Sequence, residues 1–172
     1  PMQKVLPPEL KIDVSARPLA LSDATLSRAD AAVVLLEKSA RQDKAVDTLP
    51  QGAVWRKLLH AHQRSGQESP ILVTRLANRR QTLVVVGFVK PGASGFERLD
   101  LAGKLAREVL KPGVVRLQLH AGEYTAPGER AAALEAVLSA VLAHAAPMPE
   151  QKSKATVAHD LSQVAIADRA SP

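Results

Sequence analysis

The chain has 172 residues, of which 46% are hydrophobic and only 2% aromatic, so its core has to be built from Ala, Val and Leu. This composition is typical of one globular domain and excludes a disordered chain. The formal net charge of +6 permits contact with nucleic acid, although a basic solvated surface is the simpler interpretation. There is no cysteine, which excludes disulfides and cysteine-based zinc sites.

The N-terminal residues 1–9 are predicted to form a loose arm. Pro7-Pro8 interrupts this segment before an apolar stretch can form, so it does not have the pattern of a signal peptide. No apolar segment approaches the roughly 20 residues that a membrane-spanning helix needs. We therefore expect a cytoplasmic protein with no membrane partner.

Five segments have the pattern of β-strands. Residues 10–16 alternate apolar and polar side chains, as a half-buried strand does, and 31–36, 70–76 and 114–119 are mostly apolar. The run Leu83-Val84-Val85-Val86 predicts a strand that is buried on both faces. The short polar turn at 78–80 predicts an antiparallel hairpin between the third strand and this fourth one.

Three segments have helical periodicity: 54–64, 99–110 and 129–144. Trp55, the sole tryptophan, is predicted to anchor the first of these helices in the core. Residues 38–51 are polar and predict an exposed loop, and 150–172 predict a tail or linker outside the core. The crossover from residue 83 to residue 119 predicts two parallel strands. Together these elements predict a three-layer α/β domain over residues 10–149, with a mixed sheet of about five strands.

The histidines do not predict a site. His60 and His62 would point about 200° apart on a helix, so they cannot share a metal ion. His120 lies at the end of a strand and has no neighbouring Asp, Ser or Cys in the sequence, so we expect a satisfied structural residue. We predict no catalytic residue and no metal ligand in this chain.

Two clusters could contact an anion or nucleic acid. The loop Gly92-Ala93-Ser94-Gly95 precedes a helix, where free N–H groups attract phosphates, but a tight turn with Ser94 as the helix cap is the simpler interpretation. Arginines at the predicted hairpin turn could contact phosphates, or they could simply lie exposed to solvent on that turn. The candidate contacts are Arg75, Arg79, Arg80, Gly92, Ser94 and Gly95.

The order of elements and three short segments resemble the N-terminal domain of the leucyl aminopeptidases, the cytosol aminopeptidase family. Residues 83–90 are similar to that family's Leu-Val-Gly-Leu-Gly-Lys strand, and 99–106 to the helix that follows it. Residues 131–143 resemble the helix that leads to the end of that domain. Lys152-Ser153-Lys154 lies where the family has a Tyr-Lys-Ser-Lys-like segment.

This resemblance implies a non-catalytic, macro-domain-like α/β module that supports hexamer packing and substrate access. In the family, the catalytic residues and the zinc or manganese ligands lie in a C-terminal domain, around an Asn-Thr-Asp-Ala-Glu-Gly-Arg motif. That motif is absent from this sequence, so no catalytic residue and no cofactor is carried over to it. The partners implied are a C-terminal catalytic domain, which the tail 150–172 would join, and further copies of the chain. The alternative is a stand-alone basic module that binds DNA or a nucleotide such as ADP-ribose.

Overall fold

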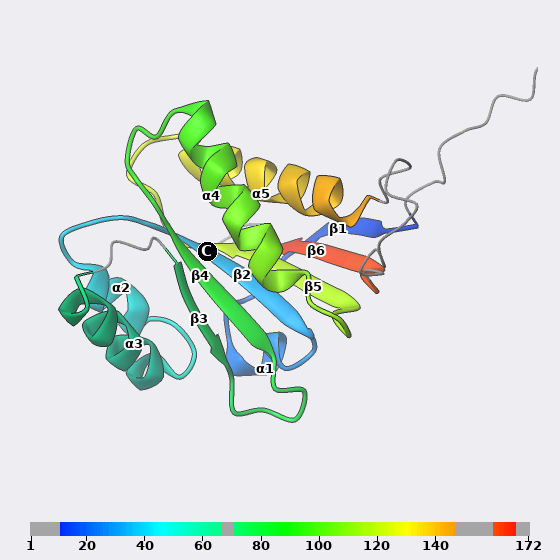
Figure 1. The fold of residues 1–172 in the computed structure, drawn as a ribbon, viewed down its shortest axis with the longest axis horizontal. Coiled ribbons are helices and arrows are strands. Elements are labelled where there is room, and N and C mark those ends of the chain that lie inside the picture. Colours follow the sequence, from blue (N-terminus) through cyan, green and yellow to red (C-terminus); the bar gives the residue numbers. More distant parts are fainter. Residues whose placement is uncertain (1–10, 67–70, 147–159, 168–172) are drawn as a thin grey trace, which may run out of the picture.

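A computed structural model describes residues 11–66, 71–146 and 160–167, and it contains one six-stranded sheet with helices on both faces (Figure 1). The strand order is β1-β6-β5-β2-β4-β3. The strands are β1 (Asp13–Arg17), β2 (Ala31–Glu37), β3 (Ile71–Arg75), β4 (Leu83–Val89), β5 (Arg116–Ala121) and β6 (Gln163–Ala167). The helices are α1 (Asp23–Leu26), α2 (Gln42–Asp47), α3 (Gly52–Arg64), α4 (Gly95–Val109) and α5 (Glu129–Ala145).

The sheet is mixed, as predicted. β2 lies between β4 and β5 and is parallel to both, and β6 lies between β5 and β1 and is parallel to both. β3 and β4 form the predicted antiparallel hairpin, in which Val73 lies opposite Val85. The carboxyl ends of five strands therefore meet at one edge of the sheet, where α/β proteins place their ligands.

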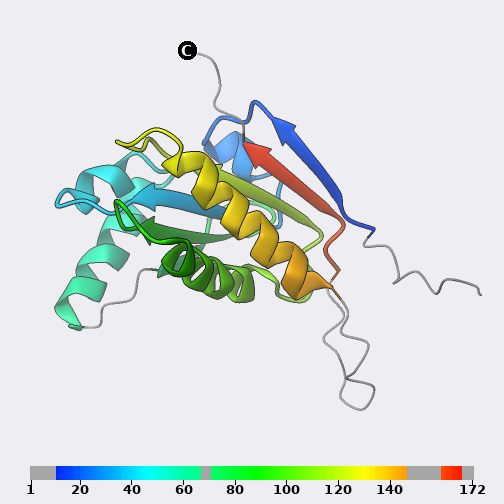
Figure 2. The same ribbon diagram turned by 90° about the horizontal axis from the view of Figure 1, so that it is seen from above.

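Two apolar cores cover the two faces of the sheet. Alternate residues of β2 point to opposite faces: Val33 and Leu35 pack under α4 and α5, whereas Val34 and Leu36 pack against the α1–α3 side. Figure 2 shows α4 and α5 together on their face of the sheet. Trp55 is 1% exposed in the α1–α3 core, and its indole N–H donates to the Pro50 carbonyl oxygen, which confirms its predicted role.

The strand β4, which lies between β2 and the edge strand β3, is buried along its whole length, as its apolar run predicts. Gly87 is its one residue without a side chain, and α4 packs directly over it. A Cβ atom at Gly87 would lie 2.9 Å from Leu105 Cδ1 and 3.1 Å from Leu105 Cδ2. The glycine thus sets how closely α4 approaches the sheet.

Three predictions are wrong in part. The segment 150–172, expected to lie outside the core, contains β6, which is inserted between β1 and β5 and makes the sixth strand. The segment 38–51, expected to be a loop, contains the short helix α2. Leu99, the first apolar residue of the predicted helical pattern 99–110, is 56% exposed instead of packed in the core. The expected arm 1–9, and the residues 152–154 that support the resemblance, lie outside the described residues.

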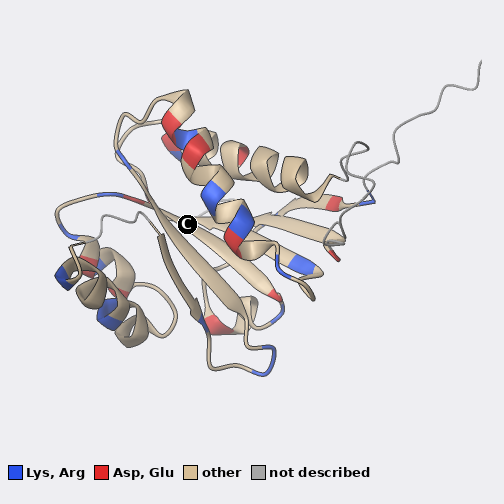
Figure 3. Ribbon diagram, in the orientation of Figure 1, with Lys and Arg blue, Asp and Glu red and all other residues tan. Residues whose placement is uncertain are grey.

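Charged residues are spread over the molecule. Lys and Arg occur on both helical layers and on the β3–β4 turn, with Asp and Glu among them (Figure 3). Within the described residues, no helix combines the length and the apolar character that crossing a membrane requires.

Candidate functional site at the carboxyl ends of the parallel strands

The loop after β5 is bound to the end of β2 by one carboxylate. Glu37 accepts hydrogen bonds from the Thr125 N–H at 2.6 Å and from the Thr125 hydroxyl at 2.7 Å. Hydrogen bonds to a charged acceptor are stronger than those between neutral groups. This contact closes the loop over the carboxyl end of the sheet.

Arg130, in the first turn of α5, joins two further strand ends. Its Nη2 donates to the carbonyl oxygens of Ala121, at the end of β5, and Ala167, at the end of β6, at 3.3 and 3.2 Å. The guanidinium therefore satisfies backbone acceptors at this edge of the sheet. In this position Arg130 acts as a structural group.

His120 is 2% exposed in β5, and its Nε2 lies 2.8 Å from Gln118 Oε1. Gln118 in turn donates from its side-chain amide to the Thr25 carbonyl oxygen at 3.0 Å. Burial, with a smaller contribution from Arg130, lowers the pKa of His120 to about 4. The ring is therefore neutral at pH 7 and donates to Gln118, as a satisfied structural histidine does.

Tyr124, the sole tyrosine, is a polar residue of this edge that the sequence analysis did not single out. Its hydroxyl is buried and has no hydrogen-bond partner among the described residues. Burial raises the pKa of Tyr124, and the neighbouring Glu37 adds to this effect. The phenol is therefore protonated at pH 7. In the sequence, the only indication that Tyr124 belongs to this end of the sheet was its place in the loop after β5.

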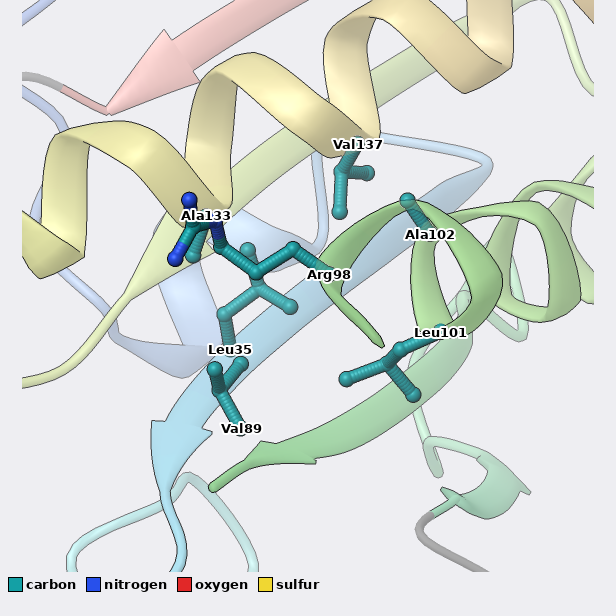
Figure 4. Close-up of a pocket in the computed structure, with 7 residues that line it drawn as sticks. All are labelled: Leu35, Val89, Arg98, Leu101, Ala102, Ala133 and Val137. Carbon is teal, nitrogen blue, oxygen red and sulfur yellow. The ribbon is translucent and has the colours of Figure 1, made fainter. Parts of the chain in front are cut away.

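A small opening is lined by Leu35 of β2, Val89 of β4, Arg98 of α4 and Ala133 of α5, together with Leu101, Ala102 and Val137 (Figure 4). Its volume is about 10 Å³, and a cavity of that size holds about one water molecule. Arg98 extends across the opening toward α5 and donates to the Ala93 carbonyl oxygen at 2.6 Å.

The glycine-rich loop, predicted as an anion contact, starts α4. The Ser94 hydroxyl accepts from the Glu97 N–H at 3.1 Å, and Glu97 Oε1 accepts from the Ser94 N–H at 3.2 Å, which forms a capping box. The Ser94 N–H, with a further contribution from the Ser94 side chain, holds the pKa of the Glu97 carboxyl below its usual range. The Gly92 N–H donates to Glu129 Oε1 at 2.8 Å. Two loop amides are thus already bound to carboxylates, and Gly95 is the first residue of the helix.

The predicted arginine cluster lies at the other end of β4. Arg75 donates to the Gln81 carbonyl oxygen at 3.1 Å, Arg80 pairs with Asp30 Oδ1 at 3.2 Å, and Arg79 is exposed. The seven residues of β4 separate this turn from the glycine-rich loop by about 20 Å. The six predicted contacts therefore form two separate groups. Binding of DNA or a nucleotide stays a prediction, and at four of these six residues an anion would compete with present hydrogen bonds.

Asp30, which the sequence analysis also missed, organises the amino ends of the strands. Its Oδ2 accepts from the N–H groups of Val115 at 3.0 Å and Arg116 at 2.9 Å. Burial raises the pKa of Asp30, but the hydrogen bonds from Arg116 and Val115 and the charge of Arg80 outweigh it, and the pKa lies below its ordinary value. The residue fixes the start of β5.

A wider groove runs beside the start of α4, and we call it the α4 groove. Phe88 and Leu101 line it, and Phe96 projects from it with 81% of its surface exposed. Its volume is about 230 Å³. Leu99, one turn further along α4, is 56% exposed. An exposed aromatic side chain next to a groove is typical of an interaction surface, because most large apolar side chains are buried.

The α4 groove also contains charged groups. Lys38 and Lys90, which follow β2 and β4, line it and form no salt bridge with a described residue. Asp100 and Lys104 line it as well, and they pair with each other at 3.2 Å along the helix. In the described parts of the chain, no three His, Asp or Glu side chains are grouped so that they could hold a metal ion.

No protein-family model and no curated protein sequence matches the chain. Among solved structures, it is similar to a mutant of the tomato leucine aminopeptidase, with a TM-score of 0.65 and 10% sequence identity. The match covers 100% of this chain and 35% of that enzyme. The similarity shows a shared fold, and the chain spans about a third of the enzyme's length.

Proposed function

We propose that this chain is the non-catalytic N-terminal domain of a metal-dependent leucyl aminopeptidase. The observation that carries the proposal is the structural match, in which the whole chain corresponds to about a third of a leucine aminopeptidase. In this proposal, N-terminal amino acids are removed from peptides by a C-terminal domain that holds zinc or manganese. Hydrogen bonds that join Glu37, Glu129 and Arg130 to backbone groups and to the Thr125 hydroxyl, at the carboxyl ends of the strands, support a scaffolding role.

The α4 groove is the surface that we propose for contact with the catalytic domain or a neighbouring subunit. Phe96 is 81% exposed in a chain that has only two phenylalanines, and burying it on association removes apolar surface from water. Lys38 and Lys90 beside it suit a partner surface that carries carboxylates. Through this contact, the domain would support hexamer assembly and control substrate access.

The first test is hydrolysis of a leucyl amide with added Mn²⁺. We expect the 172-residue chain to be inactive and the full-length gene product to be active. A full-length protein that remains inactive would contradict the proposed function.

The second test places Phe96→Ser in the full-length protein and in the isolated chain. We expect the variant to weaken assembly of the full-length protein, measured by sedimentation, and to leave the Tm of the isolated chain unchanged. Val54→Ser is the matched control, because Val54 is 41% exposed on α3, on the other face of the sheet. Equal effects of the two substitutions on assembly would contradict a role for the α4 groove.

A further inference from the structure

The strand β1 forms one edge of the sheet and is the most exposed strand of the structure. Figures 1 and 2 show β1 outermost beside β6, and within the described residues no strand pairs with its other side. Four of its five residues are exposed, and Val14 is 42% exposed. An edge of this kind offers unpaired N–H and C=O groups to another strand.

The hydrogen bonds of β1 determine which residues offer these groups. The Asp13 N–H donates to the Ser162 carbonyl oxygen at 2.9 Å, on the β6 side. Backbone groups alternate between the two sides of a strand, so those of Ser15 and Arg17 also point to β6. The N–H and C=O groups of Val14 and Ala16 therefore point outward, at the free edge.

We propose that β1 pairs with β1 of a second copy of this chain, antiparallel and with a two-fold axis at Ser15. In this register, Val14 of each copy lies opposite Ala16 of the other copy. The outward N–H and C=O groups of the two facing residues form hydrogen bonds with each other, and the two-fold axis repeats this pair. The interaction joins two six-stranded sheets into one. The proposal stands on β1 alone and goes beyond the proposed peptidase role.

The charges of β1 favour this register. Asp13 and Arg17 lie on the same face of the strand, and neither forms a salt bridge with a described residue. A two-fold axis at Ser15 places Asp13 directly opposite Arg17 of the other copy, so the pair forms twice. Opposite charges that face each other across strands stabilise the pairing, and like charges destabilise it.

The strand at the opposite edge of the sheet, β3, lacks this charge complementarity. The same antiparallel arrangement of β3 would be centred on Val73 and would place Ile71 opposite Arg75. The self-complementary sequence is thus a property of β1, as a two-fold interface requires. Pro18 directly follows Arg17 and has no N–H group, which limits the pairing to residues 13–17.

Cross-linking tests the register directly. The two copies of Ser15 form the non-hydrogen-bonded pair on the axis, with Cα atoms about 4.5 Å apart, a distance that a disulfide spans. Since the chain has no cysteine, the 172-residue Ser15→Cys variant should form a covalent dimer under mild oxidation. Ala16→Cys is the matched control, because residue 16 does not face its own copy. Equal cross-linking of the two variants, or none with Ser15→Cys, would overturn the proposal.

Charge reversal tests the contacts, with sedimentation equilibrium as the measurement. We expect Asp13→Arg alone or Arg17→Asp alone to lower the dimer association constant about tenfold or more, and the double reversal to restore it. Arg41→Asp, at an exposed site before α2, is the control for net charge. A wild-type chain that stays monomeric at all concentrations, or a double reversal as weak as the single ones, would overturn the proposal.

Discussion

The close approach of α4 to the sheet makes Gly87→Ala a quantitative test of the fold. The new methyl group would lie 2.9 Å from Leu105 Cδ1, and Leu105 is 0% exposed, so its side chain cannot move out into solvent. Overpacking of a core costs about 1–3 kcal/mol, and the loss of a strand glycine returns about 0.5–1 kcal/mol. We expect a net loss of about 1–2 kcal/mol in the free energy of unfolding, and a Tm lower by about 2–8 °C.

Two variants control this experiment, which is read by thermal and urea denaturation. Gly95→Ala should leave stability unchanged or raise it, because a Cβ atom there meets no atom within 4 Å. Leu105→Val removes the side-chain carbons that clash, so the double variant with Gly87→Ala should lose less stability than the sum of the single changes. A Gly87→Ala protein as stable as wild type, or strictly additive losses, would refute this account of the packing.

Three further predictions concern polar groups at the two ends of the parallel strands. The pKa of His120 falls from 6.5 to about 4 on folding, so as the pH drops the unfolded chain binds the proton first. The free energy of unfolding should therefore decrease by up to about 3 kcal/mol between pH 6.5 and pH 4. Urea titrations of His120→Gln across this range should lack this decrease. Tyr124→Phe should leave stability unchanged or raise it by up to about 1–2 kcal/mol, since it removes a buried hydroxyl without a partner; a marked loss of Tm would show that the hydroxyl is bound. Asp30→Ala should cost about 1–3 kcal/mol at pH 7, because it leaves the N–H groups of Val115 and Arg116 unpaired. Because the pKa of Asp30 is lower in the folded state, this contribution is fully present above pH 3.8 and is lost as the pH falls through the lower folded-state pKa. A difference from wild type that does not shrink as the pH is lowered toward 2 would contradict the assignment.

The local patterns in the sequence predicted most of the fold. The Leu83–Val86 run, the cap at Ser94 and the turn before β4 depend on residues that are neighbours in the chain, and all three are confirmed. Strand β6 was missed because its partners in the sheet, β1 and β5, are distant in the sequence. A short apolar run in a polar tail does not show locally that it will be inserted between two strands.

The difference between local and distant contacts also explains how much of the site the sequence could predict. The sequence offered the glycine-rich loop and the group Arg75, Arg79 and Arg80 as two separate candidate anion contacts, and the structure places them at opposite ends of β4. The contact of Glu37 with Thr125 joins residues that are 88 positions apart, and no local pattern predicts it. The exposure of Phe96 was also hidden, since a phenylalanine in a helical segment is more often part of the core.

We propose that this chain is one domain of a larger peptidase, and the size of the natural protein tests this proposal most directly. Antiserum raised against the chain would be used to blot extracts of the cells that produce it. The chain is 18.3 kDa and matches 35% of the tomato enzyme, so we predict one band at about three times that mass. A band at 18.3 kDa would contradict the claim, because it would leave the domain without a catalytic partner in the same chain.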